Sequence, residues 1–163
     1  MTSVTSTQSP GRASGLLALL FGAGPLDRVD RVPAWILSVL LLAARFYIAI
    51  PFWRAGQVRY ERWDDQAFLF EHVHPLPWLS PNTAALVTTG AELILPVLVV
   101  LGLFGRFAGL GLGIMAATIF FVIGGNFANA AEQFPWMAMG VLIFIAGPGR
   151  ISLDQAIRTY VLR

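Results

Sequence analysis

The sequence predicts an all-α integral membrane protein: a bundle of four transmembrane helices, with an outer-side loop or interfacial helix between the first and the second. Of its 163 residues, 56% are hydrophobic and only 12% are charged, and the mean hydropathy is +0.69. Soluble domains carry about 25% charged residues, so these values exclude an ordinary cytosolic globule. Four apolar stretches approach or exceed the length of about 20 residues that a helix needs to cross a bilayer.

The four predicted spans divide a membrane domain that covers residues 33–150. They lie at residues 33–53, 82–104, 107–125 and 134–148. The first contains one charged residue, Arg45, the second contains only Glu92, and the third contains none. The fourth is the shortest, so it either starts inside the preceding loop or tilts little. Because two residues alone join the second and third spans, these helices form an antiparallel hairpin.

The two terminal segments outside the membrane domain are predicted to lie on the cytoplasmic face. Residues 1–32 begin as a polar, Ser/Thr-rich tail that is typical of disorder, and they continue as a short apolar segment expected to lie along the interface. The alternative, a cleaved signal peptide behind Arg12, lacks a convincing cleavage site. Residues 151–163 predict an amphipathic tail, in which Ser152 caps a helix and Gln155 completes a capping box.

The arginines near the membrane ends indicate the orientation. All eleven basic residues are Arg, and more of them flank one side of the bundle than the other. The first side has Arg12, Arg28, Arg31, Arg106, Arg150, Arg158 and Arg163, and the second has Arg54, Arg59 and Arg62. Because basic residues favour the cytoplasmic side, we expect both termini in the cytoplasm and the chain in a bacterial-type inner (plasma) membrane.

Arg45 and Glu92 are the most informative residues of the membrane domain. A charged side chain inside a spanning helix costs roughly 2.5–3.5 kcal/mol on insertion scales, and it usually has a partner. At 1.5 Å per residue, the two residues lie roughly 12 and 15 Å below the outer ends of their spans. These depths predict a salt bridge between the first two spans. Pro96 predicts a helix kink, because it frees the carbonyl four residues earlier, which is that of Glu92.

Two interpretations of this pair stay open. In the functional one, the charges line a polar pocket that opens to the outer side, where Glu92 exchanges a proton with a quinone-like ring. The residues of this pocket are Arg45 and Glu92, with Thr88, Thr89, Trp53 and Arg59 near its mouth. In the structural one, the pair locks the helices together.

Small residues recur every four positions in the third span, at Gly105, Gly109, Gly113 and Ala117. Such a ridge lets a second helix backbone approach closely. A phosphate-binding loop would need a preceding strand and a Lys or Ser/Thr in register, which this segment lacks. We therefore assign these residues to helix packing.

The loop between the first two spans carries the only two histidines of the chain, His72 and His74. With Glu71 they form a weak candidate metal site, because no third strong ligand lies at a defined spacing. An exposed pair without a metal is the alternative. Earlier in the loop, Asp64 and Asp65 are suited to capping a short helix that lies on the membrane.

Several short motifs, in their order and spacing, resemble the DoxX family of small four-helix membrane proteins. They are Arg45, Phe52 and Ala55-Gly56, then Gly90-Ala91-Glu92-Leu93, then Leu101-Gly102-Leu103-Phe104-Gly105-Arg106, and finally Gly147-Pro148-Gly149-Arg150-Ile151-Ser152-Leu153-Asp154. The resemblance covers roughly residues 35–158, and none of the motifs is a catalytic signature. Where the family often has a Lys after the Ala-Gly pair, this chain has Arg59 in that neighbourhood.

The resemblance implies an association with quinone-linked oxidation, because relatives occur beside redox and metal-handling systems. The chain has no Cys and has both His in one loop, so we expect no haem, flavin or iron–sulfur cluster, and only a quinone as cofactor. The small net charge of +2 excludes a nucleic-acid surface.

Three functions follow from these observations. The first is a membrane subunit that positions a quinone or anchors a redox partner, without catalysing the reaction alone. The second is a structural or assembly subunit of a larger inner-membrane complex. The third is a metal-handling or transport accessory protein that uses His72 and His74. We expect lipid and other membrane subunits as partners.

Overall fold

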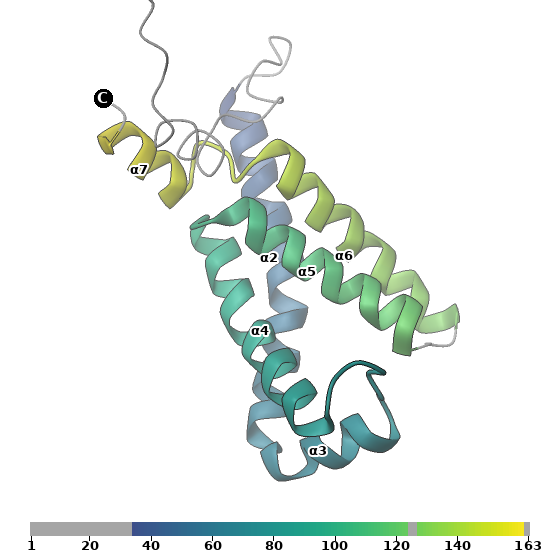
Figure 1. Ribbon diagram of the computed structural model, residues 1–163. Helices are drawn as coiled ribbons and strands as arrows, with labels where there is room; N and C mark the ends of the chain where they lie inside the picture. Colours follow the sequence, from purple (N-terminus) through teal and green to yellow (C-terminus); the bar gives the residue numbers. More distant parts are fainter. Residues whose placement is uncertain (1–33, 124–126, 162–163) are drawn as a thin grey trace, which may run out of the picture.

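The computed structural model describes residues 34–123 and 127–161, and every regular element in these residues is helical. The elements are α2 (Ala34–Glu61), α3 (Trp63–His72), α4 (Pro81–Leu101), α5 (Gly105–Thr118), the π-helical turn η2 (Ile119–Ile123), α6 (Phe127–Ala146) and α7 (Leu153–Val161). In Figure 1, α2, α4, α5 and α6 form a bundle, with α3 at one end and α7 at the other. We call these the α3 end and the α7 end. The tail predicted over residues 1–32 lies outside the described residues.

Three helical segments are long and apolar enough to cross a membrane. They cover Trp35–Glu61, Pro81–Leu101 and Gly105–Val122, the last of which joins α5 to the π-helical turn. These segments correspond to the first three predicted spans. In α6, the apolar part that the structure describes, Glu132–Ala146, is shorter. A fourth crossing therefore stays a prediction.

Helix α2 is longer than the first predicted span. The span ends at residue 53, before the first run of polar residues, whereas the helix continues to Glu61. A charge ends an apolar stretch without ending a helix, because the backbone hydrogen bonds of the helix form within the segment itself. Pro51 also lies inside α2. The added turns carry Arg59 towards the α3 end.

Helix α4 has a clear signal at each end. Ser80 caps its N-terminus by accepting a 3.4 Å hydrogen bond from the backbone N–H of Thr83. Gly102 follows its last turn with a φ of 67°, a left-handed conformation that glycine adopts without the clash of a Cβ. Between them, Pro96 lies on the buried face of the helix. That face also presents Glu92 to the interior of the bundle.

Helices α5 and α6 pack closely because both contribute glycine to their contact. A Cβ on Gly140 of α6 would lie only 2.7 Å from the Cα of Gly113. Gly105 and Gly109 likewise face side chains of α6 and of the turn that follows it. Ala117, the fourth small residue of the predicted ridge, is half-buried. The glycines of α5 therefore lie against a helix of the same chain.

The hydrophobic core lies where α2, α4, α5 and α6 meet. Ile48 and Phe52 of α2 are buried together with Leu112 of α5 and Ile143 of α6. The ring of Phe52 meets the ring of Trp136 edge-on, with 5.5 Å between the centroids. This core fixes the middle of α2. The polar contacts of the helix lie towards the two ends of the bundle.

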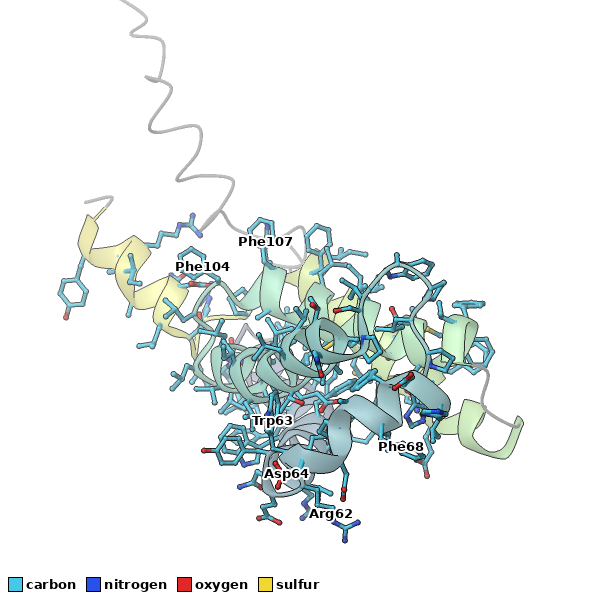
Figure 2. All side chains as sticks on the ribbon, turned by 60° about the horizontal axis from the view of Figure 1, so that its bottom comes forward. Arg62, Trp63, Asp64, Phe68, Phe104 and Phe107 are labelled. Atoms are coloured by element: carbon cyan, nitrogen blue, oxygen red, sulfur yellow. The ribbon has the colours of Figure 1, made fainter. Side chains whose placement is uncertain are left out.

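Helix α3 is held at its end of the bundle by an apolar contact. Phe70 packs against Ala84 and Ala85 of α4. Figure 2, which turns this end towards the reader, shows α3 crossing in front of the other helices, with Arg62 pointing away from them. A helix therefore occupies the predicted loop, and its position at a membrane surface stays a prediction.

Candidate functional site

An ion pair between Arg59 and Glu92 joins α2 to α4 near the α3 end. Arg59 Nε lies 2.9 Å from Glu92 Oε2, and the two side chains are 18% and 2% exposed. A carboxylate so deeply buried needs an opposite charge, because moving an ion out of water costs several kcal/mol. The pair therefore balances the charge of the carboxylate on the buried face of α4.

The two helices approach each other closely at this pair, because Gly56 lies opposite Glu92. A Cβ on Gly56 would come within 3.0 Å of Glu92 Cβ and 3.1 Å of its backbone carbonyl carbon. Arg59 lies one turn further along α2, on the same face as Gly56. Glycine thus shortens the gap that the arginine side chain spans.

Helix α3 also holds Arg59. The Nη1 group of Arg59 donates a 3.4 Å hydrogen bond to Gln66 Oε1, and Gln66 Nε2 donates to the backbone carbonyl of Arg62 at 3.0 Å. The guanidinium lies over the ring of Phe70, 5.1 Å from its centroid, in a favourable cation–π contact. Glu92, Gln66 and Phe70 together fix the guanidinium in one orientation, as a binding site requires.

A cavity of about 210 Å³ lies beside the ion pair, bordered by α2, α3 and the loop after it, α4 and α5. Arg59 and Glu92 form its charged wall, and Thr88 and Thr118 contribute hydroxyl groups. The apolar lining comes from Phe70, Leu76, Trp78, Leu79, Val87, Ala91, Met115 and Ile119. An apolar pocket with a few convergent polar groups is the usual form of a small-molecule site.

The cavity borders the junction between α5 and the π-helical turn. Thr118 is the last residue of α5 and Ile119 is the first of the turn, and both line the cavity. Such turns are frequent at functional sites. The hydroxyl of Thr118 donates a 3.0 Å hydrogen bond to the backbone carbonyl of Ile114. Its single proton is thereby used, and its oxygen can only accept from a ligand.

Arg45 does not belong to this site. The salt bridge predicted between Arg45 and Glu92 is wrong, because Arg59 occupies the carboxylate. Arg45 is 0% exposed and donates hydrogen bonds to the backbone carbonyls of Val100 and Ile151, near the α7 end. The predicted depth of Arg45 is counted from residue 53, where the apolar stretch ends. Because α2 runs about two turns further, its later arginine lies level with the carboxylate.

Asp154 supplies the opposite charge near Arg45. Its carboxylate oxygens each accept a 2.9 Å hydrogen bond, from the backbone N–H groups of Phe104 and Gly105 at the N-terminus of α5. Its own N–H donates to the backbone carbonyl of Gly102 at 3.0 Å. We call Arg45, Gly102 and Asp154 the α7-end latch. The carboxylate and both terminal nitrogens of the arginine are bonded within the chain, which is typical of a structural role.

The other predicted pocket residues are divided between surfaces. Thr88 lines the cavity with Arg59 and Glu92. Thr89 is 3% exposed and borders a separate, wider groove of about 670 Å³. Trp53 is 38% exposed on α2 and does not line the cavity. Half of the predicted set therefore comes together.

The two histidines have different surroundings. His72 is exposed and stacks on Phe68, with 4.4 Å between the ring centroids. His74 is partly buried beside Phe70, and its burial, followed by the positive charge of Arg59, lowers its pKa below the usual 6.5. Among the residues that the structure describes, no three His, Cys, Asp or Glu side chains form a group that could hold a metal ion. The metal site stays a prediction.

Comparison with known proteins identifies the family. The model of the DoxX family matches residues 40–125, which is more than half of the chain. This chain belongs to the DoxX family. The resemblance seen in its motifs is confirmed, and the DoxX protein is a membrane protein. The matched residues include Arg59 and Glu92 and end before Asp154.

An uncharacterised protein of Haemophilus influenzae is similar to this DoxX protein. The two are 28% identical over 131 residues, which covers 74% of this chain and 85% of the relative. No solved structure matches the chain. Membership of a family transfers no activity by itself, because the activity depends on the residues of the site.

Sequence reasoning missed the residues that hold Arg59 and line the DoxX cavity. Gln66 contacts Arg59, and Phe70 and Trp78 line the cavity; all three lie in the segment that the sequence assigned to the membrane surface. One signal was present, because Gln66 and Phe70 are four residues apart and so share a face of α3. That this face meets Arg59 depends on the full length of α2, which the apolar stretch alone underestimates.

Proposed function

We propose that this DoxX protein is a membrane subunit that binds the ring of a quinone beside Arg59 and Glu92 and presents it to a redox partner. The observation that carries the proposal is a fixed arginine–carboxylate pair in the wall of an otherwise apolar cavity. A quinone combines an apolar ring with polar oxygens, so it matches both parts of this wall. The proposed role is binding and positioning, and no catalysis is assigned to the chain alone.

The size of the cavity suits a single ring. An apolar cavity of about 150 Å³ binds one benzene molecule. With about 210 Å³, this cavity has room for one substituted six-membered ring, while a long isoprenoid tail has to lie outside it, among the lipid chains. Trp78 and Leu79 of the loop and Met115 of α5 offer apolar surfaces to the faces of the ring.

The polar groups can hold the oxygens of the ring. Arg59 uses Nε for Glu92 and Nη1 for Gln66, which leaves its second terminal nitrogen to donate to a ring oxygen. A bound quinone supplies the transfer of two electrons and two protons. The part of this chain is to orient the ring, exclude water, and exchange a proton at the carboxylate of Glu92.

The proposed location is the inner membrane of a bacterium, with both termini in the cytoplasm. The sequence assigns seven arginines to the α7 end and three to the α3 end, and this excess supports the α7 end as the cytoplasmic one. The cavity then lies in the outer half of the membrane. A redox partner would reach it from that side.

A structural role in a larger membrane complex is the second candidate. The α7-end latch favours it, because there a buried arginine holds helices together through backbone carbonyls. The pair of Arg59 and Glu92 could do the same at the α3 end. The two candidates differ in what Glu92→Gln changes: ligand content in a binding site, and stability alone in a structural clasp.

The quinone content of the purified protein tests the proposal. The full chain is extracted from bacterial membranes into native nanodiscs, and quinone is quantified per mole of protein by mass spectrometry. We expect Glu92→Gln to lower the total of bound quinone and hydroquinone about tenfold, because it removes the charge-assisted contact of the carboxylate with a ring hydroxyl. Glu71→Gln is the matched control, since it makes the same change at an exposed position of α3, and it should retain the quinone.

Two outcomes would overturn the proposal. Wild-type protein that carries no quinone above the lipid background has no such site. Equal quinone content in wild type and Glu92→Gln, together with a lower melting temperature of the variant, assigns the ion pair to the structural role instead.

A further inference from the structure

We propose that the cavity selects the reduced, hydroxyl-bearing form of its ring ligand, a hydroquinone, over the oxidised diketone. The inference rests on the proposed function and adds a preference for one redox state. It follows from a count of the hydrogen-bond donors and acceptors that the cavity wall offers to a ligand.

Glu92 is the first acceptor. In the ion pair its carboxylate only accepts hydrogen bonds, with room for about four. Arg59 Nε lies 2.9 Å from Oε2, yet Oε2 is buried and accepts no hydrogen bond from the described residues. The side chain is 2% exposed and lines the cavity, so bulk water does not satisfy that oxygen. A ligand that donates a hydrogen there removes the cost of an unpaired buried acceptor.

Thr118 of α5 is a second acceptor in the cavity wall. Its hydroxyl proton is engaged by the carbonyl of Ile114 in the same helix. Towards the cavity its oxygen therefore accepts and does not donate. Glu92 on α4 and Thr118 on α5 face one cavity from two helices, so both walls favour a ligand with O–H groups.

Arg59 does not reverse this preference. Its free terminal nitrogen can donate to any ring oxygen, because both a hydroxyl and a carbonyl accept. Thr88 lies one turn before Glu92 on the same face, and its hydroxyl can donate or accept. A hydroquinone hydroxyl can accept from Arg59 and donate to Glu92 at once. A quinone carbonyl can only accept, so it turns a lone pair towards the carboxylate.

Binding of two small probes tests the inference. The wild-type chain in nanodiscs of quinone-free lipid is dialysed anaerobically against tetramethyl-1,4-hydroquinone or tetramethyl-1,4-benzoquinone, and bound ligand is quantified by mass spectrometry. We expect the hydroquinone to bind about tenfold more tightly than the quinone. A ratio of this size corresponds to one additional hydrogen bond to a charged group. Glu92→Gln should lower this ratio severalfold, because the amide can also donate to a carbonyl, and should leave the part of the preference that Thr118 contributes.

Thr118→Val provides a second, gentler variant. It keeps the shape of the side chain and removes the acceptor, so the ratio should fall severalfold while the quinone binds as before. Thr159→Val is its control, because Thr159 is exposed on α7, away from the cavity. This pair keeps the inference testable even if Glu92→Gln does not fold.

The outcomes separate the inference from the proposed function. Equal binding of both probes by the wild type, or tighter binding of the quinone, overturns the redox preference and leaves the ring site in place. Binding of neither probe overturns both. A ratio that survives in Glu92→Gln and in Thr118→Val also overturns the inference, because the named acceptors would not cause it.

Discussion

Arg45 and Arg59 of helix α2 lie about four helical turns apart, and they differ in whether a cavity lies beside them. Arg45 at the α7 end gives both terminal nitrogens to backbone carbonyls and lies near Asp154. Arg59 at the α3 end pairs with Glu92 and has a cavity beside it. The surroundings of Arg45 are filled by groups of the chain itself, whereas polar groups beside Arg59 remain available to a ligand.

This difference shows that a buried charge does not by itself mark a functional site. At the α7 end the charge is enclosed among main-chain groups, so it fixes the positions of helices. At the α3 end the carboxylate of Glu92 has unused acceptors next to empty space. The number of partners supplied by the chain, rather than the presence of the charge, separates structure from binding.

The largest expected effect is that of Asp154→Asn on stability. The amide keeps one acceptor but turns an NH₂ group towards a backbone N–H of Phe104 or Gly105, and it removes the charge that stabilises Arg45. We expect a loss of about 3 kcal/mol, as for a broken buried pair, measured by thermal unfolding in detergent. Asp64→Asn, at an exposed position, is the control. Equal melting temperatures for both variants would contradict the latch.

Gly102→Ala should be the next most harmful change. With a φ of 67°, its Cβ would lie 2.5 Å from Arg45 Nη1 and from Ser152 Cβ. We expect a loss of about 2 kcal/mol from the left-handed conformation and the clash. Gly90→Ala is the matched variant near the other end, where a Cβ meets nothing within 4 Å. It should cost nothing, and a similar loss in both variants would remove the contrast between the ends.

Glu92→Gln should cost less stability than either change at the latch. The amide oxygen still accepts from Arg59, which stays partly hydrated and bound to Gln66 and Phe70. We expect about 1 kcal/mol, measured by the same unfolding experiment. A loss as large as that of Asp154→Asn would show that the two ion pairs have the same structural role.

The smallest effect concerns pH. Because burial and then Arg59 lower the pKa of His74 below 6.5, the folded protein prefers the neutral imidazole. Its contribution to stability is therefore complete above pH 6.5 and is lost as the pH falls through the lowered pKa. His74→Gln should flatten the fall of the melting temperature as the pH drops below 6.5. His72→Gln, an exposed change, should leave that fall as it is in the wild type.

The sequence predicts the helices of this protein better than it predicts the site. Three apolar stretches correspond to helices long enough to span a membrane, because apolar length is a local property. The partner of Glu92 is not local. It depends on how far α2 continues past its last apolar residue, and the polar turn that carries Arg59 has no sequence feature that separates helix from loop.

The cavity could not be predicted for a related reason. Its wall combines Phe70 from α3, Trp78 from the loop and Met115 from α5, residues that are far apart in the sequence. An aromatic residue in a loop beside a membrane is usually an interfacial anchor, and only the docking of α3 on Ala84 and Ala85 turns Phe70 inward. Tertiary packing, rather than composition, creates the site.

The latch also bears on how the protein is made. Arg45 enters the membrane with the first described helix, but Ile151 and Asp154 are synthesised only after the rest of the bundle. Until then Arg45 has the carbonyl of Val100 but lacks Ile151 and Asp154, and the α5 N-terminus lacks its cap. The final segment thus completes contacts that the first helix lacks while it is being made. A chain that stops before α7 would keep an incompletely paired charge in its first span.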